Sequence, residues 1–400
     1  MVRESGWNTV KLKDICDFIG GGTPSKQVEN FWCGNIPWIS SSDLIESSIW
    51  EINITRYITA EAVAKSATHI CPRNTVLVVS RVGVGKVAIA PFEVCTSQDF
   101  TNLVSKKHDA RFLAYCIQNK MKIMAEKTQG TSIKGVTVEN IAQMEIELPP
   151  QEEQTAIAEA LSDIDNLISS LQKLIEKKKA IKQGAMQELI TGKKRLSGFS
   201  GEWSYKSLGI LGDLSREAIN PQSLSETSFY EYSMPAYDNG RQPEKTSGKS
   251  MHSSRLKIYG EIILFNKLNV RQRRVWHVKE CLENAVCSSE FLPYHSLGVH
   301  SEFLYQVLLC DKTTVDFENM STGTSNSQKR ITPSDFLEYE IALPEKDEQE
   351  AIAQVLSDMD SEIEQLEKKL AKYQQIKQGM MQELLTGRIR LIGTDRRGYK

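Results

Sequence analysis

Apolar residues recur at alternating steps of four and three along two long segments of the chain. The positions are Ile157, Leu161, Ile164, Ile168, Leu171 and Ile175 in the first segment, and Ile352, Leu356, Met359, Ile363, Leu366, Leu370 and Tyr373 in the second. In a helix this spacing makes one narrow apolar stripe, flanked here by Glu and Lys. So narrow a stripe needs a partner helix, and the other segment is the candidate. The alternative is that each segment is an amphipathic helix packed only on its own domain.

The two segments belong to an internal repeat. Residues 148–196 read LPPQEEQTAIAEALSDIDNLISSLQKLIEKKKAIKQGAMQELITGKKRL, and residues 343–391 read LPEKDEQEAIAQVLSDMDSEIEQLEKKLAKYQQIKQGMMQELLTGRIRL. Acidic residues crowd the start of each copy, as the helix dipole favours, and Gly192 and Gly387 suit a C-terminal stop. Each copy therefore predicts one helix of about 40 residues and about 60 Å.

A second feature of the repeat lies near the helix ends. Each copy carries Lys-Gln-Gly followed by Gln-Glu-Leu, although glycine inside a helix costs about 1 kcal/mol relative to alanine. Retention of this glycine in both copies suggests the close approach of another backbone, and a bend in the helix is the alternative. The residues predicted to bind a partner subunit are Lys182, Gln183, Gly184, Gln187, Lys377, Gln378, Gly379 and Gln382.

The segment before each helix is rich in strand-like and turn-like patterns. The first contains TVLVVS and KVAIAPFEV, and the second contains GEIILFNKL and RRVWHVKE. The two segments resemble each other only at their ends, as in RFLAYCIQ and EFLYQVLL. We therefore predict an α+β chain with two β-rich modules joined by two long helices, which form an intramolecular antiparallel coiled coil in a pseudo-twofold arrangement. The expected boundaries are 1–150 and 197–344 for the modules, 151–196 and 345–391 for the helices, and 392–400 for a tail.

Composition narrows the class of protein. Hydrophobic residues make up 40% and charged residues 25%, as in a soluble globular protein. No apolar run is long enough to span a bilayer, and the N-terminus lacks a signal-peptide pattern, so we expect a cytoplasmic protein. The eight cysteines form no C-x-x-C pair and the histidines lack ligand spacing. We therefore expect no metal and no cofactor.

The organisation itself suggests a reader of DNA. Two different heads on a two-helix spacer would recognise two different features at a fixed distance. Half-sites on one side of a duplex, about one helical turn or 34 Å apart, offer such a pattern. The net charge of -2 requires that basic residues cluster locally if the protein binds DNA.

The first head carries a motif with a known likeness. Gly20-Gly21-Gly22-Thr23-Pro24-Ser25 precedes Trp32-Cys33-Gly34-Asn35-Ile36-Pro37-Trp38 and Ser41-Ser42-Asp43-Leu44. With Ser80-Arg81, the Gln98 loop, the L-P-x-x-x-E-Q module ends and the doubled K-Q-G-x-M-Q-E-L-x-T-G, this resembles the target-recognition domains of type I restriction-modification specificity subunits. The resemblance covers residues 6–391. It implies a non-catalytic DNA-sequence specificity subunit.

The second head departs from the first. It has neither T-P-S nor I-P-W, and instead shows YSMPAYDNGR from Tyr232 and NKLNVRQRR from Asn266. This is similar to another subtype of recognition domain in the same family. Two different heads imply an asymmetric, bipartite double-stranded DNA target.

The chemistry of the side chains indicates which residues are candidates for contacting DNA. Polar loops offer hydroxyls and N–H groups to phosphates, and Arg, Lys, Asn and Gln pair with base edges. The candidates are Thr23, Ser25, Lys26, Ser41, Arg81, Lys86, Gln98, Ser132, Lys134, Asn239, Arg241, Lys267, Asn269, Arg271, Arg273, Ser325 and Lys329. The alternative for each is a solvated surface charge or a local turn bond. We expect Trp32 and Trp38 to lie in the core rather than stack on bases.

The residues do not nominate an enzyme. The Gly83-Val84-Gly85-Lys86 run lacks the first glycine of a phosphate loop, since Ser80 stands there, and Val87 replaces its Ser or Thr. Neither a dinucleotide fingerprint nor an amino-methyltransferase tetrapeptide is present. By resemblance, methylation belongs to two copies of a modification subunit, and cleavage to restriction subunits that combine motor and nuclease.

Two other functions stay open. The chain could be a coiled-coil adaptor whose heads bind protein surfaces, without sequence-specific DNA binding. It could also be a self-contained nuclease or methyltransferase with a divergent site. Salt-dependent DNA affinity distinguishes the first, and turnover by the chain alone distinguishes the second.

Overall fold

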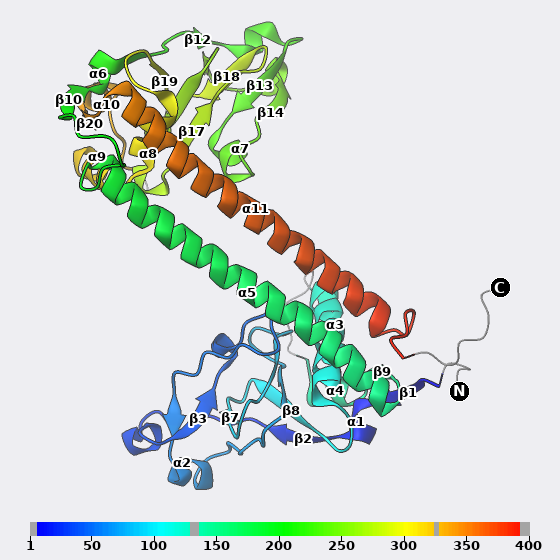
Figure 1. Ribbon diagram of the computed structural model, residues 1–400. Coiled ribbons are helices and arrows are strands. Elements are labelled where there is room, and N and C mark those ends of the chain that lie inside the picture. Colours follow the sequence, from blue (N-terminus) through cyan, green and yellow to red (C-terminus); the bar gives the residue numbers. More distant parts are fainter. Residues whose placement is uncertain (1–5, 129–135, 324–327, 393–400) are drawn as a thin grey trace. The chain divides into compact units, whose positions relative to one another are not determined.

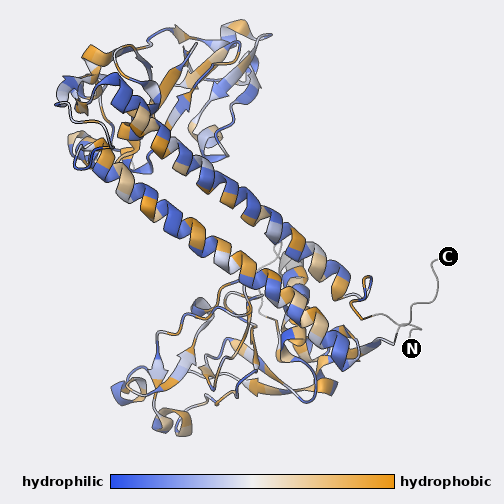
Figure 2. Cartoon of the chain, viewed as in Figure 1, coloured by the Kyte–Doolittle hydropathy of each residue, from blue (hydrophilic) through white to orange (hydrophobic). Residues whose placement is uncertain are grey.

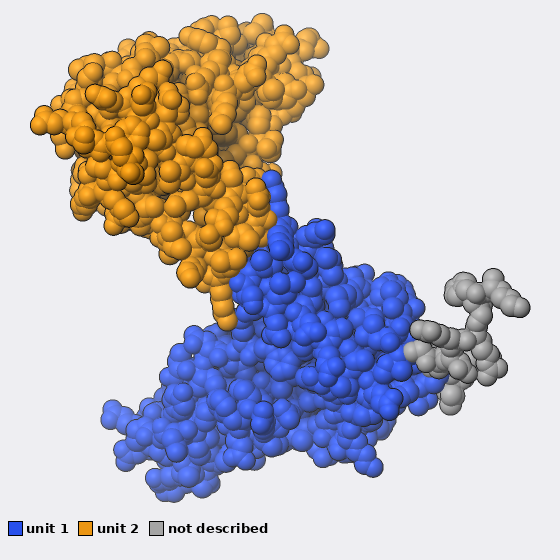
Figure 3. All heavy atoms as spheres, in the orientation of Figure 1, with its two compact units in different colours: residues 1–172, 368–400 blue, residues 173–367 orange. Residues whose placement is uncertain are grey.

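The computed structural model describes residues 6–128, 136–323 and 328–392. The chain divides into two compact units, of which the first is built from two separate stretches of sequence and the second from one (Figure 3). Unit 1 comprises Met1–Gln172 and Lys368–Lys400, and unit 2 comprises Lys173–Glu367. Each unit therefore contains one head and parts of both long helices.

The two repeat copies form long helices, as the apolar spacing predicts (Figure 1). They are α5, Gln151–Ile190, and α11, Lys346–Leu384. Both run as uninterrupted α-helix and begin in acidic turns. Gly192 and Gly387 follow their ends with φ of 68° and 70°, a left-handed conformation that glycine adopts without steric cost.

Within the residues that the structure describes, the head of unit 1 has three small sheets. The strand orders are β1-β9, β2-β8-β5-β6 and β4-β3-β7, with β3 and β7 parallel and the other pairs antiparallel. The strands are β1 (Asn8–Lys11), β2 (Cys16–Gly20), β3 (Ile36–Ile39), β4 (Tyr57–Ile58), β5 (Val76–Val79), β6 (Val87–Ile89), β7 (Cys95–Thr96), β8 (Phe100–Ser105) and β9 (Glu145–Leu148). The helices are α1 (Leu12–Ile15), α2 (Ala60–Ala64), α3 (Ala110–Thr128) and α4 (Val138–Ala142), with the 3-10 turns η1 (Glu29–Trp32) and η2 (Ser41–Asp43).

Unit 2 contains the second head, which also has three sheets over its described residues, 197–323 and 328–344. The strand orders are β10-β20, β11-β19-β16-β17 and β12-β15-β18-β13-β14. The strands are β10 (Ser204–Ser207), β11 (Gly212–Leu214), β12 (Ala218–Ile219), β13 (Ser228–Tyr232), β14 (Glu244–Ser247), β15 (Arg255–Lys257), β16 (Ile262–Asn266), β17 (Val275–Val278), β18 (Ala285–Ser288), β19 (Phe291–Ser296) and β20 (Glu340–Leu343). The helices are α6 (Leu208–Leu211), α7 (Met234–Asp238), α8 (Ser301–Leu309), α9 (Asp311–Met320) and α10 (Pro333–Glu338), with η3 (Pro221–Leu224), η4 (Gly248–Ser250) and η5 (Val270–Gln272).

The two heads share a scaffold that their sequences do not reveal. The four-stranded sheets have the same order, with β2, β8, β5 and β6 corresponding to β11, β19, β16 and β17. Phe100 lies opposite Val79 in the first, and Phe291 lies opposite Asn266 in the second. A parallel pair recurs as well, β3 with β7 and β13 with β18. The heads differ mainly in the remaining sheet, which has three strands in one and five in the other.

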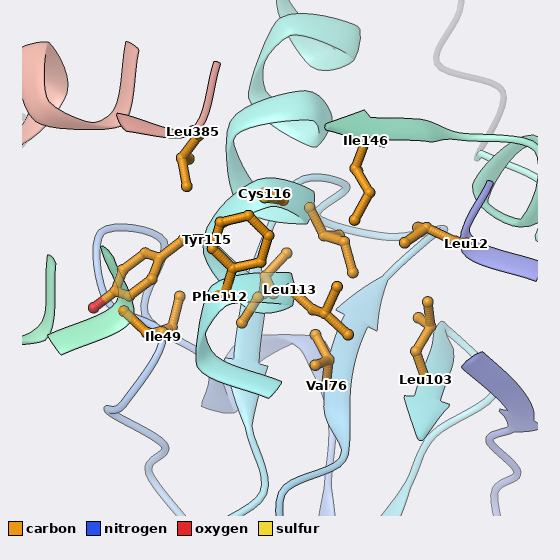
Figure 4. Packing of buried hydrophobic residues seen from close by; sticks show 14 of the residues in the cluster. Leu12, Ile49, Val76, Leu103, Phe112, Leu113, Tyr115, Cys116, Ile146 and Leu385 are labelled. Carbon is orange, nitrogen blue, oxygen red and sulfur yellow. The ribbon is translucent and has the colours of Figure 1, made fainter. Parts of the chain in front are cut away.

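The core of each unit joins the head to both helices. In unit 1, Phe112 and Leu113 of α3 pack over Val76 of β5, and Leu161 of α5 and Leu385 just after α11 complete the cluster (Figure 4). In unit 2 the corresponding cluster includes Phe303, Phe336, Met186 of α5 and Leu356 of α11. Burial of each large apolar side chain contributes about 1.5–3 kcal/mol, so each head is held to the helices by its core.

The same arrangement of a tryptophan, a glutamate and an arginine occurs in both units. Trp7 Nε1 donates to Glu153 Oε2 at 3.1 Å, and Arg390 forms a bidentate ion pair with the same carboxylate at 2.6 Å. In unit 2 the corresponding three residues are Trp203, Glu348 and Arg195, with distances of 3.1 and 2.6 Å. In each unit the glutamate lies in one repeat helix and the arginine follows the end of the other, so the contact requires both copies of the repeat.

The helices pack on each other in antiparallel fashion. In unit 2, Lys178 pairs with Glu362 and Lys179 with Glu367. Both helices are mostly hydrophilic, with hydrophobic positions recurring along them (Figure 2). The predicted α+β class and the pairing of the two repeat helices are confirmed. The alternative is also partly right, because the first turns of each helix pack on the head that precedes it.

Candidate nucleic-acid interface

Corresponding hairpin loops lie at the same edge of the four-stranded sheet in each head. We call residues 80–86, between β5 and β6, hairpin loop 1, and residues 267–274, between β16 and β17, hairpin loop 2. Val79 N donates to Lys86 O at 3.0 Å, and Asn266 N donates to Arg274 O at 3.0 Å. The loops therefore have the same anchoring to their strands, and both contain predicted DNA-binding residues.

Hairpin loop 1 presents Arg81 to solvent and is held from beneath by Lys86. The Lys86 ammonium donates to Ser41 O at 3.1 Å and to Leu44 O at 2.9 Å, so two predicted residues, Ser41 and Lys86, lie together. Gly83 and Gly85 take φ of 81° and 108°, which explains the glycines of this loop. In this geometry Lys86 positions the loop, and Arg81 is its exposed cation.

The glycine-rich segment packs beside the Gln98 loop. The Thr23 hydroxyl hydrogen bonds to Gln98 Oε1, which brings these two predicted residues together. A Cβ at Gly21 would lie 1.9 Å from Ser97 O, so this glycine is required by close packing of two backbones. Ser25 and Lys26 are exposed beyond it.

The two tryptophans of the first motif have different surroundings. Trp38 is buried, and its Nε1 donates to Gly22 O at 2.9 Å. Trp32 is half-buried against Trp38, edge to face, with ring centroids 5.1 Å apart. The core position predicted for Trp38 is confirmed.

Hairpin loop 2 is rich in arginines, each paired with a carboxylate. Arg274 forms a bidentate pair with Asp238 at 2.8 and 2.7 Å, and this position corresponds to Lys86. The other two pairs are Arg271 with Glu318 at 3.3 Å and Arg273 with Asp311 at 2.5 Å. All three acidic partners lie far from the loop in sequence, so residue spacing did not predict them.

Other predicted residues of the second head border this loop. Asn269 N donates to Lys329 O at 2.9 Å, which places Lys329 beside hairpin loop 2. Lys267 begins the loop and is partly exposed. The predicted residues Ser132, Lys134 and Ser325 lie outside the residues that the structure describes.

Arg241 is oriented by two tyrosines that the sequence did not single out. Its guanidinium donates to Tyr305 Oη at 3.0 Å and to Tyr237 Oη at 3.1 Å. It also lies 4.9 Å from the centroid of the Tyr237 ring, as in a cation–π contact. Arg241 follows α7, Asn239 and Gly240 in a left-handed turn, with φ of 57° at Arg241. The predicted pair Asn239 and Arg241 thus sits at one exposed corner of the head.

The lysines of the Lys-Gln-Gly motifs are engaged within the chain. Lys377 Nζ lies 2.6 Å from Asp165 and donates to Ser47 O at 3.0 Å. Lys182 pairs with Asp360 at 2.5 Å. Each pair joins the two helices, because each Lys comes from one repeat copy and each Asp from the other. These lysines were predicted to bind a partner, and the structure gives them this second role.

The remaining residues of the motifs differ between units. Gln183 and Gln187 donate to Asp311 at the start of α9, whereas Gln378 and Gln382 are exposed. At Gly184 and Gly379 an added Cβ would meet no atom within 4 Å. Nothing in the described chain requires glycine there, which leaves room for a partner's backbone.

A buried histidine gives unit 2 a pH dependence. His277 Nδ1 lies 2.9 Å from Glu302 Oε2 and His277 Nε2 lies 2.7 Å from Glu261 Oε1, so the protonated imidazole donates to both carboxylates. Burial lowers the pKa of His277, but the hydrogen bonds and charges of Glu302 and Glu261 outweigh it and raise the pKa above the ordinary value. Burial likewise raises the pKa of Glu302, and His277 outweighs it so that this pKa is lowered. Glu261, His277 and Glu302 line a surface cavity, together with Lys279, His300, Ser301, Glu350, Ala353, Gln354 and Ser357.

We expect this cluster to stabilise the fold most between about pH 4.3 and 6.5, the ordinary values of Glu and His. Because the pKa of His277 is raised in the folded state, its contribution to stability is complete below the ordinary histidine pKa and is lost as the pH rises through the raised pKa. Because the pKa of Glu302 is lowered, its contribution is lost as the pH falls through the lowered pKa. At pH 5.5 we expect the free energy of unfolding of His277→Gln, measured with urea, to be lower than that of the parent by about 1.5–3 kcal/mol, the range for charged hydrogen bonds. At pH 8.5 the difference should shrink. A pH-independent difference would contradict the ion-pair account.

Among the described residues, no group of three His, Cys, Asp or Glu side chains could hold a metal ion. No helix within the described ranges is long and apolar enough to cross a membrane. The eight cysteines are free thiols, and Cys33 is the one that is exposed.

Comparison with known proteins follows the duplication. The family model for the type I restriction modification DNA specificity domain matches twice, at residues 4–183 and 201–378. The chain is 24% identical over 425 residues to the type I restriction enzyme MjaVIII specificity subunit of Methanocaldococcus jannaschii, covering 96% of this chain and 93% of that one. It is 34% identical over 171 residues to the MjaIX specificity subunit of the same organism. That match spans 42% of this chain and only 40% of the relative's length.

Solved structures agree on the fold. The crystal structure of a type I restriction-modification S subunit from M. genitalium aligns with a TM-score of 0.60 at 15% identity, over 95% of this chain and 96% of that one. A chain described with the complex assembly and conformational transition of the type I R-M system aligns with a TM-score of 0.58 at 14% identity, over 97% and 100%. At these identities the likeness concerns the fold alone.

Proposed function

Because the chain belongs to the family of type I restriction modification DNA specificity domains, we propose that it reads an asymmetric bipartite double-stranded DNA sequence, one half-site per head. A specificity subunit is a non-catalytic component, and its task is recognition. The observation that carries the proposal is the pair of corresponding hairpin loops, which differ in sequence on the same scaffold. In the proposal, residues 1–150 and 197–344 are the target-recognition domains, 151–196 and 345–391 the spacer helices, and 392–400 a tail.

The ion pairs of hairpin loop 2 are compatible with DNA binding, because DNA can replace a carboxylate partner of an arginine. Hairpin loop 2 holds its arginines in surface ion pairs, which contribute about 0–1 kcal/mol each. A phosphate or a guanine edge can therefore replace the carboxylate of Glu318 beside Arg271 at little cost. In the first head the exposed Arg81 has no ion pair in the described part of the chain. This arrangement reconciles a net charge of -2 with DNA binding, because paired arginines become available only on contact.

We further propose that the chain directs other subunits to its site in the cytoplasm. The partners are modification (methyltransferase) subunits, in two copies because the helix motif occurs twice, and restriction subunits. No cofactor is needed for recognition itself. Gly184 of α5 and Gly379 of α11 are the proposed contact points for the modification subunits.

The glycine contact makes a specific prediction. Gly184→Ala and Gly379→Ala should each stabilise the isolated chain by about 0.5–1 kcal/mol, because alanine is the better helix former and its Cβ meets nothing. Phenylalanine at the same positions should weaken the complex with the modification subunit at least about tenfold, about 1.4 kcal/mol. Calorimetry of complex formation measures the second effect, and thermal unfolding of the chain alone measures the first. Full affinity with both phenylalanines in place would remove these glycines from the interface.

The salt dependence of DNA binding tests the proposed function. For the complex of the chain with its modification subunit, we expect the logarithm of the association constant for duplex DNA to fall linearly with the logarithm of the salt concentration. Arg81→Ala and Lys267→Ala should each reduce that slope by about 1 if the residue contacts a phosphate. Lys346, an exposed lysine at the start of α11, provides the control, and Lys346→Ala should leave the slope unchanged. Absence of any salt-dependent affinity would favour the coiled-coil adaptor.

A further inference from the structure

Hairpin loop 2 is attached to helix α9 by two ion pairs. Arg271 lies 3.3 Å from Glu318 and Arg273 lies 2.5 Å from Asp311. Asp311 is the first residue of α9, where a carboxylate is favoured by the helix dipole. The loop therefore rests on the N-terminal turn of α9 through a charge that the helix itself stabilises.

The same carboxylate reaches a third element. Asp311 Oδ2 accepts a hydrogen bond from Gln183 Nε2 at 2.8 Å and another from Gln187 Nε2, both from α5. The bond from Gln183 is the largest influence that lowers the pKa of Asp311, followed by Arg273, while burial opposes them. One side chain thus joins hairpin loop 2, α9 and the repeat helix.

The described part of unit 1 has no counterpart of this junction. Alignment of RFLAYCIQNK with EFLYQVLLCD places Lys120 at the position of Asp311, and a lysine cannot accept from glutamine amides. In the first head, hairpin loop 1 is instead held by Lys86 on the carbonyls of Ser41 and Leu44. The two heads hold corresponding loops by different means.

The geometry points to Asp311 as a positioning residue that fixes hairpin loop 2 on helix α5 and thereby fixes which bases the second head reads. Two non-glycine residues of the loop, Asn269 and Arg273, have φ of 51° and 48°. Such conformations persist only where the surroundings hold them, and Arg273 is held by Asp311. A base-reading side chain needs placement within about 0.5 Å, so a freed loop reads less selectively. The effect of Asp311 on which bases are read rests on the proposed function.

Two readouts test the inference on the full chain in complex with its modification subunit. The variants are Asp311→Ala, which removes the junction, Asp311→Asn, which keeps the acceptor without the charge, and Lys312→Ala as the control on the next, exposed residue. Amide hydrogen exchange in residues 267–274 should rise about tenfold in Asp311→Ala, less in Asp311→Asn, and not in the control. Exchange in residues 80–86 should stay at the parent rate in all three, because that loop is anchored separately.

The second readout is the sequence that becomes methylated in cells. In Asp311→Ala, discrimination against wrong bases should fall about tenfold in one half-site, the low end of the effect of a mismatched base pair, with the other half-site unchanged. Loop exchange at the parent rate would overturn the junction. Faster exchange with an unchanged motif, or equal loss of discrimination in both halves, would overturn the positioning role. A parent chain with no bipartite motif would instead contradict the proposed function, while the exchange result would still decide whether Asp311 holds the loop.

Discussion

Deletion of one heptad, residues 168–174, from α5 alone is expected to abolish sequence-specific DNA binding, a loss of at least about 10³-fold. Asp165 and Lys182 are 17 residues apart, and their partners Lys377 and Asp360 are also 17 apart, by subtraction of their positions. Both ion pairs can therefore form at once between antiparallel helices. Loss of seven residues from one helix shortens it by about 10 Å, so one pair and its core contacts must break.

A matched deletion separates spacing from damage. Removal of residues 168–174 and 363–369 together restores the equal separation of the two ion pairs and keeps the heptad phase. Specific binding should then return, with the gap between half-sites shorter by about three base pairs, since each base pair rises about 3.4 Å. Mapping the methylated motif of both variants measures the gap. An unchanged motif after the single deletion would contradict the role of the helices as spacer.

Replacement of Lys377 by methionine is expected to lower the free energy of opening of unit 1 by about 3–5 kcal/mol. The Lys377 side chain is 11% exposed and that of its partner Asp165 is 6% exposed, so the substitution leaves a buried carboxylate without its cation. Tyr115 still donates to Asp165 at 2.8 Å, which offsets part of the cost. Amide exchange of α3 and β5 reports the opening of this unit.

The repeat supplies the control for this prediction. Lys182→Met breaks the corresponding pair in unit 2, but Asp360 is 44% exposed and keeps a bond from Gln306 at 3.2 Å. Its carboxylate can hydrate, so the loss should be about 0–1 kcal/mol, as for surface pairs. Equal losses in the two variants would show that burial of the aspartate does not govern the cost.

The helices could be predicted because their information is local. Apolar spacing, acidic first turns and terminal glycines all lie within each segment, and α5 begins at Gln151 and α11 at Lys346. The strand order common to the two heads could not be predicted, because their middles share little sequence. Val79 and Asn266, for example, occupy the same sheet position with unrelated side chains.

The candidate site was less accessible to sequence than the fold. The basic residues of hairpin loop 2 stood out as a cluster, but their partners Asp238, Asp311 and Glu318 lie at separations of roughly 36 to 47 residues, and pairing at such distances is set by tertiary structure. Lys86 illustrates the same limit. The sequence predicts it as a DNA contact, and the structure shows that its ammonium also donates to two carbonyls of its own head.

The most direct test of the central claim is a genome-wide map of methylated bases in a methylation-free host that co-expresses this chain with its modification subunit. A reader with two different heads on one spacer predicts a split, asymmetric motif, with specified bases in two halves and a gap of fixed length between them. A stable complex that adds no methylation, or one that methylates a single continuous motif, would contradict it.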